Sequence, residues 1–106
     1  MDITLKEAIG FIHGYWLEPE AGTLFYFNTA MGQVRVLHRG GVLPISLALG
    51  LSEEGGRLWV QIEKEKYCLA VRRQPKDLLE IETLPGEALL LERAAPGSPS
   101  GWKGHV

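Results

Sequence analysis

The feature that most constrains the fold is a segment in which apolar and small residues alternate one for one. Its apolar positions are Ile45, Leu47, Leu49 and Leu51, and its small positions are Ser46, Ala48 and Gly50. Because successive side chains of a β-strand point to opposite faces, this pattern predicts a strand with one buried apolar face. The small residues on the second face favour close packing or curvature, as at the corner of a barrel.

Six further segments have the composition of strands and are separated by turn residues. The predicted strands are Thr23–Asn28, Gln33–His38, Arg57–Glu63, Tyr67–Val71, Leu78–Thr83 and Ala88–Arg93. The predicted turns or loops are Asn28–Gly32, Arg39–Gly41, Ser52–Gly56, Gln74–Asp77 and Leu84–Glu87, and Lys64–Lys66 is either a charged turn or an exposed strand end. Because these connections are too short to hold a crossover helix, the segments predict an antiparallel meander.

The chain begins with a segment that has the period of a helix. Apolar residues follow the spacing of one helix face: Leu5, Ala8, Ile9 and Ile12. Thr4 and Glu7 form a capping-box pattern, in which each side chain accepts the backbone N–H of the other residue. Gly10 and Gly14 limit the length, because glycine destabilises a helix by about 1 kcal/mol relative to alanine. A helix of about two turns is therefore expected.

A meander of seven to eight strands closes most economically into a barrel, because closure removes the unpaired edges. We therefore expect a mainly β protein, a small antiparallel barrel preceded by a short N-terminal helix. The expected barrel domain covers residues 1–94. Residues 95–106 are rich in Pro, Gly and Ser, which predicts a flexible C-terminal tail. Trp102 in this tail is either exposed to solvent or an aromatic anchor.

Composition excludes several functional classes. The 106 residues carry a net charge of −2 at pH 7, and their positive charges are scattered, which argues against nucleic-acid binding. The single cysteine, Cys68, cannot form an internal disulfide, so a disulfide-stapled secreted module is excluded. The first residues have no signal-peptide pattern, and no apolar run is long enough to span a membrane. The expected location is the cytoplasm.

The order of these features resembles that of small bacterial lipocalin-like (calycin) barrel domains. In that family a short helical turn precedes a Gly-x-Trp sequence on the first strand, and Gly14–Trp16 stands in that place here. An aromatic strand and a hairpin glycine follow, as Phe25–Asn28 and Gly32 do in this chain. The last family strand carries an arginine near its end, which Arg93 matches.

The resemblance implies that Trp16 and Arg93 close the barrel. In the family the arginine lies over the tryptophan at one end, and a guanidinium on an indole face contributes roughly 1–2 kcal/mol when desolvated. Arg93 shares one face of its predicted strand with Leu89 and Leu91, so it is expected to point inward. The family's second fingerprint, a turn of the Thr-Asp-Tyr type, is absent from Arg72–Asp77. Binding inside the barrel is then expected at the far end of the strands.

The sequence offers no catalytic or metal-binding signature. His13, His38 and His105 have none of the spacings typical of metal ligands, and Cys68 has no nearby partner. Cys68 is expected to be a structural thiol, and His38 is either a surface residue or a haem ligand in a barrel pocket. No pair of carboxylates is brought together by the sequence, so acid–base catalysis is not supported. We expect a protein that is not an enzyme and holds no metal or cofactor.

Aromatic residues are the remaining candidates for a binding site. The tentative ligand-binding residues lie on neighbouring predicted strands: Tyr26, Phe27, Trp59 and Tyr67. Trp59 falls on the face opposite Leu58 and Val60, which predicts either an exterior position or a break in the alternation. An exterior tryptophan either marks a partner surface or is covered by the helix or the tail.

Three functions are compatible with these features. The first is a barrel that binds an apolar or aromatic small molecule, which predicts an internal cavity of several hundred Å³. The second is a protein-interaction module, such as an inhibitor, immunity or accessory protein, acting through an exterior aromatic patch or as a homodimer. The third is an enzyme, which needs a polar pocket with a perturbed titratable group. The first is the prediction adopted, and the second is the main alternative.

Overall fold

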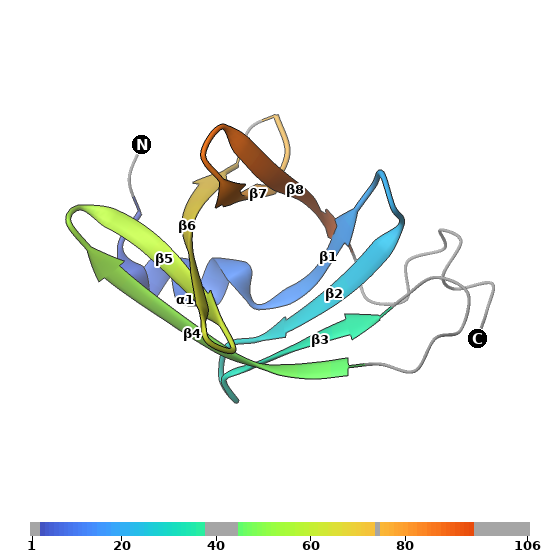
Figure 1. Ribbon diagram of the computed structural model, residues 1–106, viewed down its shortest axis with the longest axis horizontal. Helices are drawn as coiled ribbons and strands as arrows, with labels where there is room; N and C mark the ends of the chain where they lie inside the picture. Colours follow the sequence, from blue (N-terminus) through green and yellow to red (C-terminus); the bar gives the residue numbers. More distant parts are fainter. Residues whose placement is uncertain (1–2, 38–44, 74, 95–106) are drawn as a thin grey trace.

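The computed structural model describes residues 3–37, 45–73 and 75–94, and within them one helix precedes eight strands. The elements are α1 (Leu5–Ile12), β1 (Gly14–Glu18), β2 (Thr23–Asn28), β3 (Gln33–Leu37), β4 (Ile45–Glu54), β5 (Arg57–Ile62), β6 (Glu65–Arg72), β7 (Leu78–Leu84) and β8 (Glu87–Ala94). Each strand pairs antiparallel with the next, and β8 pairs with β1, so the sheet closes into a barrel (Figure 1). The predicted meander, its closure and its N-terminal helix are confirmed.

One predicted loop is wrong in its extent. β4 continues through Ser52–Glu54, which pair with the first residues of β5, so the loop predicted at Ser52–Gly56 shrinks to Gly55 and Gly56. Both glycines have positive φ, at 61° and 77°, the backbone region that glycine adopts without steric cost. The sequence prediction ended the strand at its first polar residues. A hairpin that projects beyond the core, however, tolerates polar side chains on both faces.

The core fills the middle of the barrel with the residues that the alternation directs inward. The buried cluster consists of Ala8, Ile12, Trp16, Phe27, Val34, Leu49, Val60, Leu69, Leu79, Ile81 and Leu91. It draws on α1 and on all eight strands, so the helix and the sheet share a single core. The interior of the barrel is therefore filled by its own side chains, as is common in small eight-stranded barrels.

Helix α1 covers one end of the barrel. It starts at the predicted capping box, in which Thr4 Oγ1 accepts the Glu7 N–H and the Glu7 carboxylate accepts the Thr4 N–H. Ala8 and Ile12 are buried, but Ile9, predicted on the same apolar face, is 38% exposed. The buried face of the helix is therefore shifted from the predicted one, because Phe11 rather than Ile9 packs against the core. Among the described residues, no helix is long and apolar enough to cross a membrane.

The two ends of the barrel differ in whether the helix covers them. The plugged end carries α1 and the connections β2–β3, β4–β5 and β6–β7. The open end carries the connections β1–β2, β5–β6 and β7–β8, together with the end of β3 at Leu37 and the start of β4 at Ile45. In Figure 1, α1 lies behind the strands, so the reader looks into the open end.

Candidate functional site

Trp16 is the centre of the plugged end. Its side chain is 0% exposed, and strand β1 directs it into the barrel beneath α1. The indole Nε1–H donates to the carbonyl oxygen of Ile12 at 2.8 Å. The last carbonyls of a helix have no partner within the helix, so this bond satisfies one of them in a buried position. Trp16 therefore fills space and fastens the end of the helix to the barrel.

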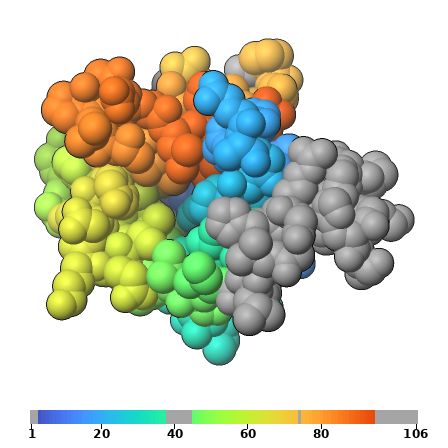
Figure 2. Space-filling model, turned by 45° about the vertical axis from the view of Figure 1, so that its right-hand side comes forward, coloured from blue at the N-terminus to red at the C-terminus, as the bar shows by residue number. Residues whose placement is uncertain are grey.

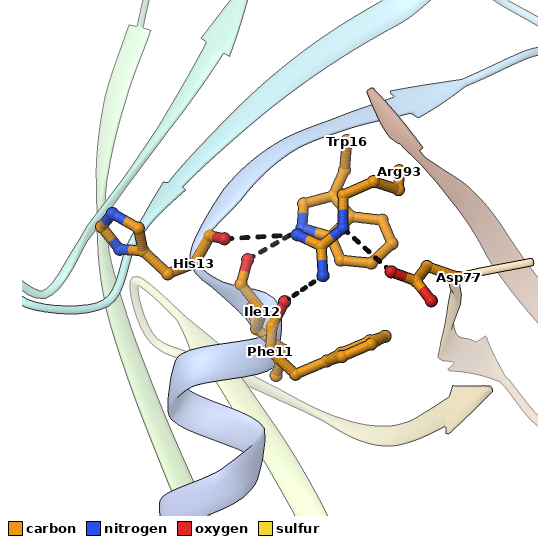
Figure 3. Close-up of polar contacts among 6 residues, drawn as sticks. All are labelled: Phe11, Ile12, His13, Trp16, Asp77 and Arg93. Carbon is orange, nitrogen blue, oxygen red and sulfur yellow. Dashed lines mark hydrogen bonds and ion pairs between the residues drawn. The ribbon is translucent and has the colours of Figure 1, made fainter. Parts of the chain in front are cut away.

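Arg93 lies over Trp16 and completes the plug (Figure 3). Its guanidinium carbon is 4.2 Å from the centroid of the Trp16 ring and 4.8 Å from that of Phe11. Nη2 donates to the carbonyl oxygen of Phe11 at 2.5 Å, and Nη1 donates to that of His13 at 3.3 Å. Nε donates to Asp77 Oδ2 at 3.3 Å. One side chain of β8 thus holds the end of α1, the indole and the β6–β7 connection together.

Gly14 makes room for this arginine. Its φ is +131°, and a Cβ atom at this position would lie 3.2 Å from Arg93 Nη1. Any other residue would be strained in its backbone and crowded against the guanidinium. The glycine and the tryptophan of the Gly-x-Trp sequence are therefore both explained by the plug: one leaves space for the arginine, and the other receives it.

The open end is lined by inward-facing apolar side chains that keep part of their surface exposed. Five of them pack against the core and are only partly buried: Phe25, Leu47, Ile62, Tyr67 and Leu89. Each lies no more than three residues from a connection at the open end. Ile45, on the same inward face, is 49% exposed. This group of residues is called the mouth below.

The mouth is shallow, because the middle of the barrel is filled. Val60, Leu79, Ile81 and Leu91 lie beneath it and are each 3% exposed or less. The space-filling view shows a hollow between the orange β7–β8 segment, the yellow β5–β6 segment and the cyan β2 (Figure 2). A molecule bound there would rest on the core rather than inside a deep chamber.

The four tentative ligand-binding residues lie in three different environments. Phe27 is a core residue, 1% exposed, and Tyr67 belongs to the mouth. Tyr26 is outside, with its ring centroid 4.7 Å from that of Tyr15. Trp59 is also outside, where its Nε1–H donates to Glu54 O at 3.2 Å and Lys66 Nζ lies 5.6 Å from its ring centroid. Because neighbours along a strand point to opposite faces, Tyr26 and Phe27 cannot share a pocket.

Sequence reasoning missed most of the mouth. Phe25, Leu47, Ile62 and Leu89 carry no chemical signature, and each reads as an ordinary core position. The signal that could have found them combines two observations: an inward place in the alternation and closeness to a turn at the end opposite Trp16. Together, the two criteria select residues at the open end of the barrel rather than residues in the middle of its core.

Other titratable candidates are placed at the surface. Cys68 is half-buried on the outer face of β6, with Arg57 Nη1 3.7 Å from its Sγ. His13 Nδ1 accepts the backbone N–H of Thr29 at 3.2 Å. Within the described residues, no group of three or more His, Cys, Asp or Glu side chains is placed to hold a metal ion. His38, Trp102, His105 and the predicted tail at 95–106 lie outside the described residues.

A hollow of about 570 Å³ lies beside the β4–β5 hairpin, between Ile3 ahead of α1 and the ends of β5 and β6. Its lining combines apolar and charged side chains, and Arg72 forms an ion pair with Glu80 at 2.9 Å. The apolar lining residues are Ile3, Leu58, Leu69 and Val71, and the charged ones are Glu53, Arg57, Arg72 and Glu80. No protein-family model, curated protein or solved structure matches the chain. Function therefore has to be inferred from the contrast between the two ends of the barrel.

Proposed function

We propose that the protein is a lipocalin-like binding barrel that takes an apolar or aromatic small molecule at its mouth. The observation that supports this most strongly is the asymmetry of the barrel ends. One end is sealed by Trp16, Arg93 and α1, and the other presents partly exposed apolar side chains on the inward face. A non-catalytic role and a cytoplasmic location are parts of the same proposal.

The chemistry of the mouth selects the ligand class. The lining of the mouth is aliphatic and aromatic, and the phenol hydroxyl of Tyr67 contributes a polar group to it. The nearby Glu18 carboxylate is held by its own turn, where it accepts the backbone N–H groups of Glu20 and Ala21 at 3.1 and 2.6 Å. A site of this kind excludes strongly charged ligands, because the free-energy cost of removing their charge from water would not be offset by a polar partner in the site. A flat apolar molecule with one polar group fits best.

The depth of the mouth sets the expected affinity. Burying about 300 Å² of apolar ligand surface contributes about 7 kcal/mol. Association costs at least about 4 kcal/mol in lost translational and rotational freedom. The balance of about 3 kcal/mol corresponds to binding in the millimolar range. A weakly held, exchangeable ligand is therefore expected.

Native mass spectrometry of the protein purified from its own host tests the proposal. Because a weakly held ligand is lost during purification, we expect uptake of an added neutral apolar probe such as N-phenyl-1-naphthylamine, with one molecule per chain. The matched variants are Leu89→Gln in the mouth and Leu90→Gln next to it, which is 44% exposed on the outer face. Leu89→Gln should weaken probe binding about tenfold or more, which corresponds to losing 1.4 kcal/mol, and Leu90→Gln should leave it unchanged.

Two outcomes would overturn the proposal. Equal loss of probe binding in both variants would show that the probe does not distinguish the mouth from the outer face. A retained protein partner together with no uptake of any apolar probe would favour the interaction-module alternative instead. Trp59, the exterior tryptophan on which that alternative relied, has contacts within the chain, to Glu54 and Lys66.

A further inference from the structure

The hairpin of β4 and β5 projects from the barrel wall and leaves one edge of β4 without a strand (Figure 1). β3 pairs with β4 over Ile45–Ala48, whereas β5 pairs with β4 over Leu49–Glu54. In the part of the chain that the structure describes, Leu49–Glu54 therefore has a strand on its β5 side alone. An edge of this kind offers backbone donors and acceptors to a further strand.

Alternate residues of β4 direct their backbone groups toward this free edge. The Leu49 N–H donates to Gly32 O on the β3 side, whereas the Ala48 carbonyl accepts the Glu63 N–H on the β5 side. Because consecutive strand residues direct their backbone groups to opposite sides, those of Leu51 and Glu53 point to the free edge. Beyond Gly32 the edge thus presents two N–H donors and two carbonyl acceptors.

A hollow lies beside the same edge, at the plugged end of the barrel. It has a volume of about 210 Å³ and is lined by Ile9, Thr29, Leu49 and Leu51. Ile9 is the helix residue that the core leaves 38% exposed. Side chains directly opposite each other in a strand pair lie on the same face. A strand added to β4 would therefore place the side chain opposite Leu51 at this hollow, where an apolar group fits.

Charge argues against two β4 edges pairing with each other. If two copies paired antiparallel with their Ser52 residues opposite each other, Leu51 of one copy would lie opposite Glu53 of the other. The Glu53 carboxylate would then point toward the apolar hollow. The same pairing would also bring the two Glu53 carboxylates to diagonal positions on one face, where like charges repel. Pairing about Glu53 itself would set the carboxylates directly opposite. Charged residues on strand edges commonly prevent self-association in this way.

We propose that the free edge of β4 binds an extended segment of a partner protein as an added antiparallel strand. The segment carries an apolar residue opposite Leu51, which enters the hollow. Two residues before it, a Lys or Arg lies opposite Glu53, because antiparallel strands run in opposite directions. Backbone bonds supply affinity, and the hollow and the carboxylate supply selectivity. This site is independent of the mouth, which lies at the other end of the barrel.

The probe for the test is a capped synthetic peptide with the sequence Thr-Val-Thr-Lys-Thr-Leu-Thr-Val. A control peptide has serine in place of the leucine. Amide hydrogen exchange of the full chain, followed by NMR, gives a readout that only edge pairing produces. With the first peptide, exchange should slow at the amides of Leu51 and Glu53. The amides of Gly50 and Ser52, which point to β5, should not change. The control peptide should bind about tenfold more weakly or not at all, for a loss of at least 1.4 kcal/mol.

Variants separate the charge from the backbone donor. Glu53→Gln removes an exposed ion pair and should weaken peptide binding about two- to fivefold. Glu53→Pro also removes an N–H that points away from β5, so it leaves the ladder within the chain intact and should weaken binding about tenfold beyond Glu53→Gln. Glu82→Gln on β7 is the matched control and should have no effect. If Glu53→Pro does not fold, Glu53→Gln and the exchange pattern decide.

Three results would overturn the proposal. The first is an exchange pattern in which the peptide protects amides elsewhere or none at all at millimolar concentration. The second is equal binding of the two peptides. The third is a concentration-dependent dimer in which Leu51 and Glu53 are protected without peptide, because the edge would then be occupied by a second copy of the chain.

Discussion

The two ends of this barrel are built from the same inward-facing positions, yet they have opposite properties. At the plugged end, Trp16 is fully buried, and Arg93 donates to Phe11, His13 and Asp77. At the open end, the mouth residues face the same interior but are only partly buried, and α1 lies at the opposite end. The two ends therefore differ in what covers the strand ends. The sheet itself does not distinguish them, because strand pairing is continuous around the barrel.

This contrast teaches how a small barrel can combine stability with an accessible surface. A chain of this size buries a modest fraction of its surface and has little stability to spare. Concentrating polar and aromatic contacts at one end lets the other end leave apolar surface exposed. The buried contacts and the exposed apolar surface then belong to different residues, which makes the contrast testable by substitution at each end.

The largest effect is expected from Trp16→Ala. Removing a fully buried indole from the plug should destabilise the fold by about 3–5 kcal/mol, because the cavity cannot collapse completely. Denaturant unfolding measures the change in the free energy of unfolding. Trp59→Ala, on the outer face, is the matched control and should cost much less. Similar losses for the two variants would contradict the assignment of Trp16 to the plug.

The middle and the mouth are compared by the same substitution two residues apart on β8. Leu91→Ala removes a side chain that is 0% exposed and should cost about 2–5 kcal/mol. Leu89→Ala removes a partly buried side chain and should cost about 1 kcal/mol, near the centre of the distribution for point mutations. Equal losses in thermal or denaturant unfolding would mean that the mouth is packed like the core.

Arg93→Met tests the hydrogen bonds of the plug, because it removes the guanidinium and keeps a long, unbranched side chain. The variant leaves the carbonyls of Phe11 and His13 without their donor, at a cost of about 1–3 kcal/mol. Arg93→Lys keeps the charge but loses the planar fork, so its unfolding midpoint should fall between those of the wild type and Arg93→Met. A midpoint for Arg93→Met equal to that of the wild type would show that the guanidinium is dispensable.

The smallest effect is expected at the helix start. The backbone N–H of Thr4, and then its hydroxyl, hold the pKa of Glu7 below its ordinary value of 4.5, with a smaller contribution from Arg73. A carboxyl with a lowered folded pKa stabilises the fold above its unfolded pKa, and this stabilisation is lost as pH falls through the folded pKa. The wild type should therefore exceed Glu7→Gln in stability at pH 7 and match it near pH 2. A difference independent of pH would contradict the capping box as its source.

Much of the fold could be predicted because each strand carries its own alternation and its own turn. The run from Ile45 to Leu51 identified β4, and Pro85 and Gly86 identified the turn between β7 and β8. The extension of β4 to Glu54 was missed, because its polar residues have no periodic signal. The exposure of Ile9 was also missed, since periodicity does not say which part of the helix surface the barrel end covers.

The site was predicted less well, for a physical reason. Residue chemistry singled out aromatic side chains, but the mouth is defined by position along the barrel axis, which depends on strand stagger. Tyr67 lies in the mouth, whereas Tyr26 and Trp59 lie outside and Phe27 lies in the core. Trp16 and Arg93 were selected by a family resemblance, and the structure places the guanidinium of Arg93 over the Trp16 ring.

The most direct test of binding at the open end is a methyl NMR titration with the neutral probe N-phenyl-1-naphthylamine. Binding at the mouth predicts shifts at the methyl groups of Leu47, Ile62 and Leu89. The methyl groups of Ile12 and Leu58, at the plugged end, should stay in place. Shifts concentrated at Ile12 and Leu58, or a saturating titration that leaves Leu47, Ile62 and Leu89 unmoved, would contradict the claim that this barrel binds at its open end.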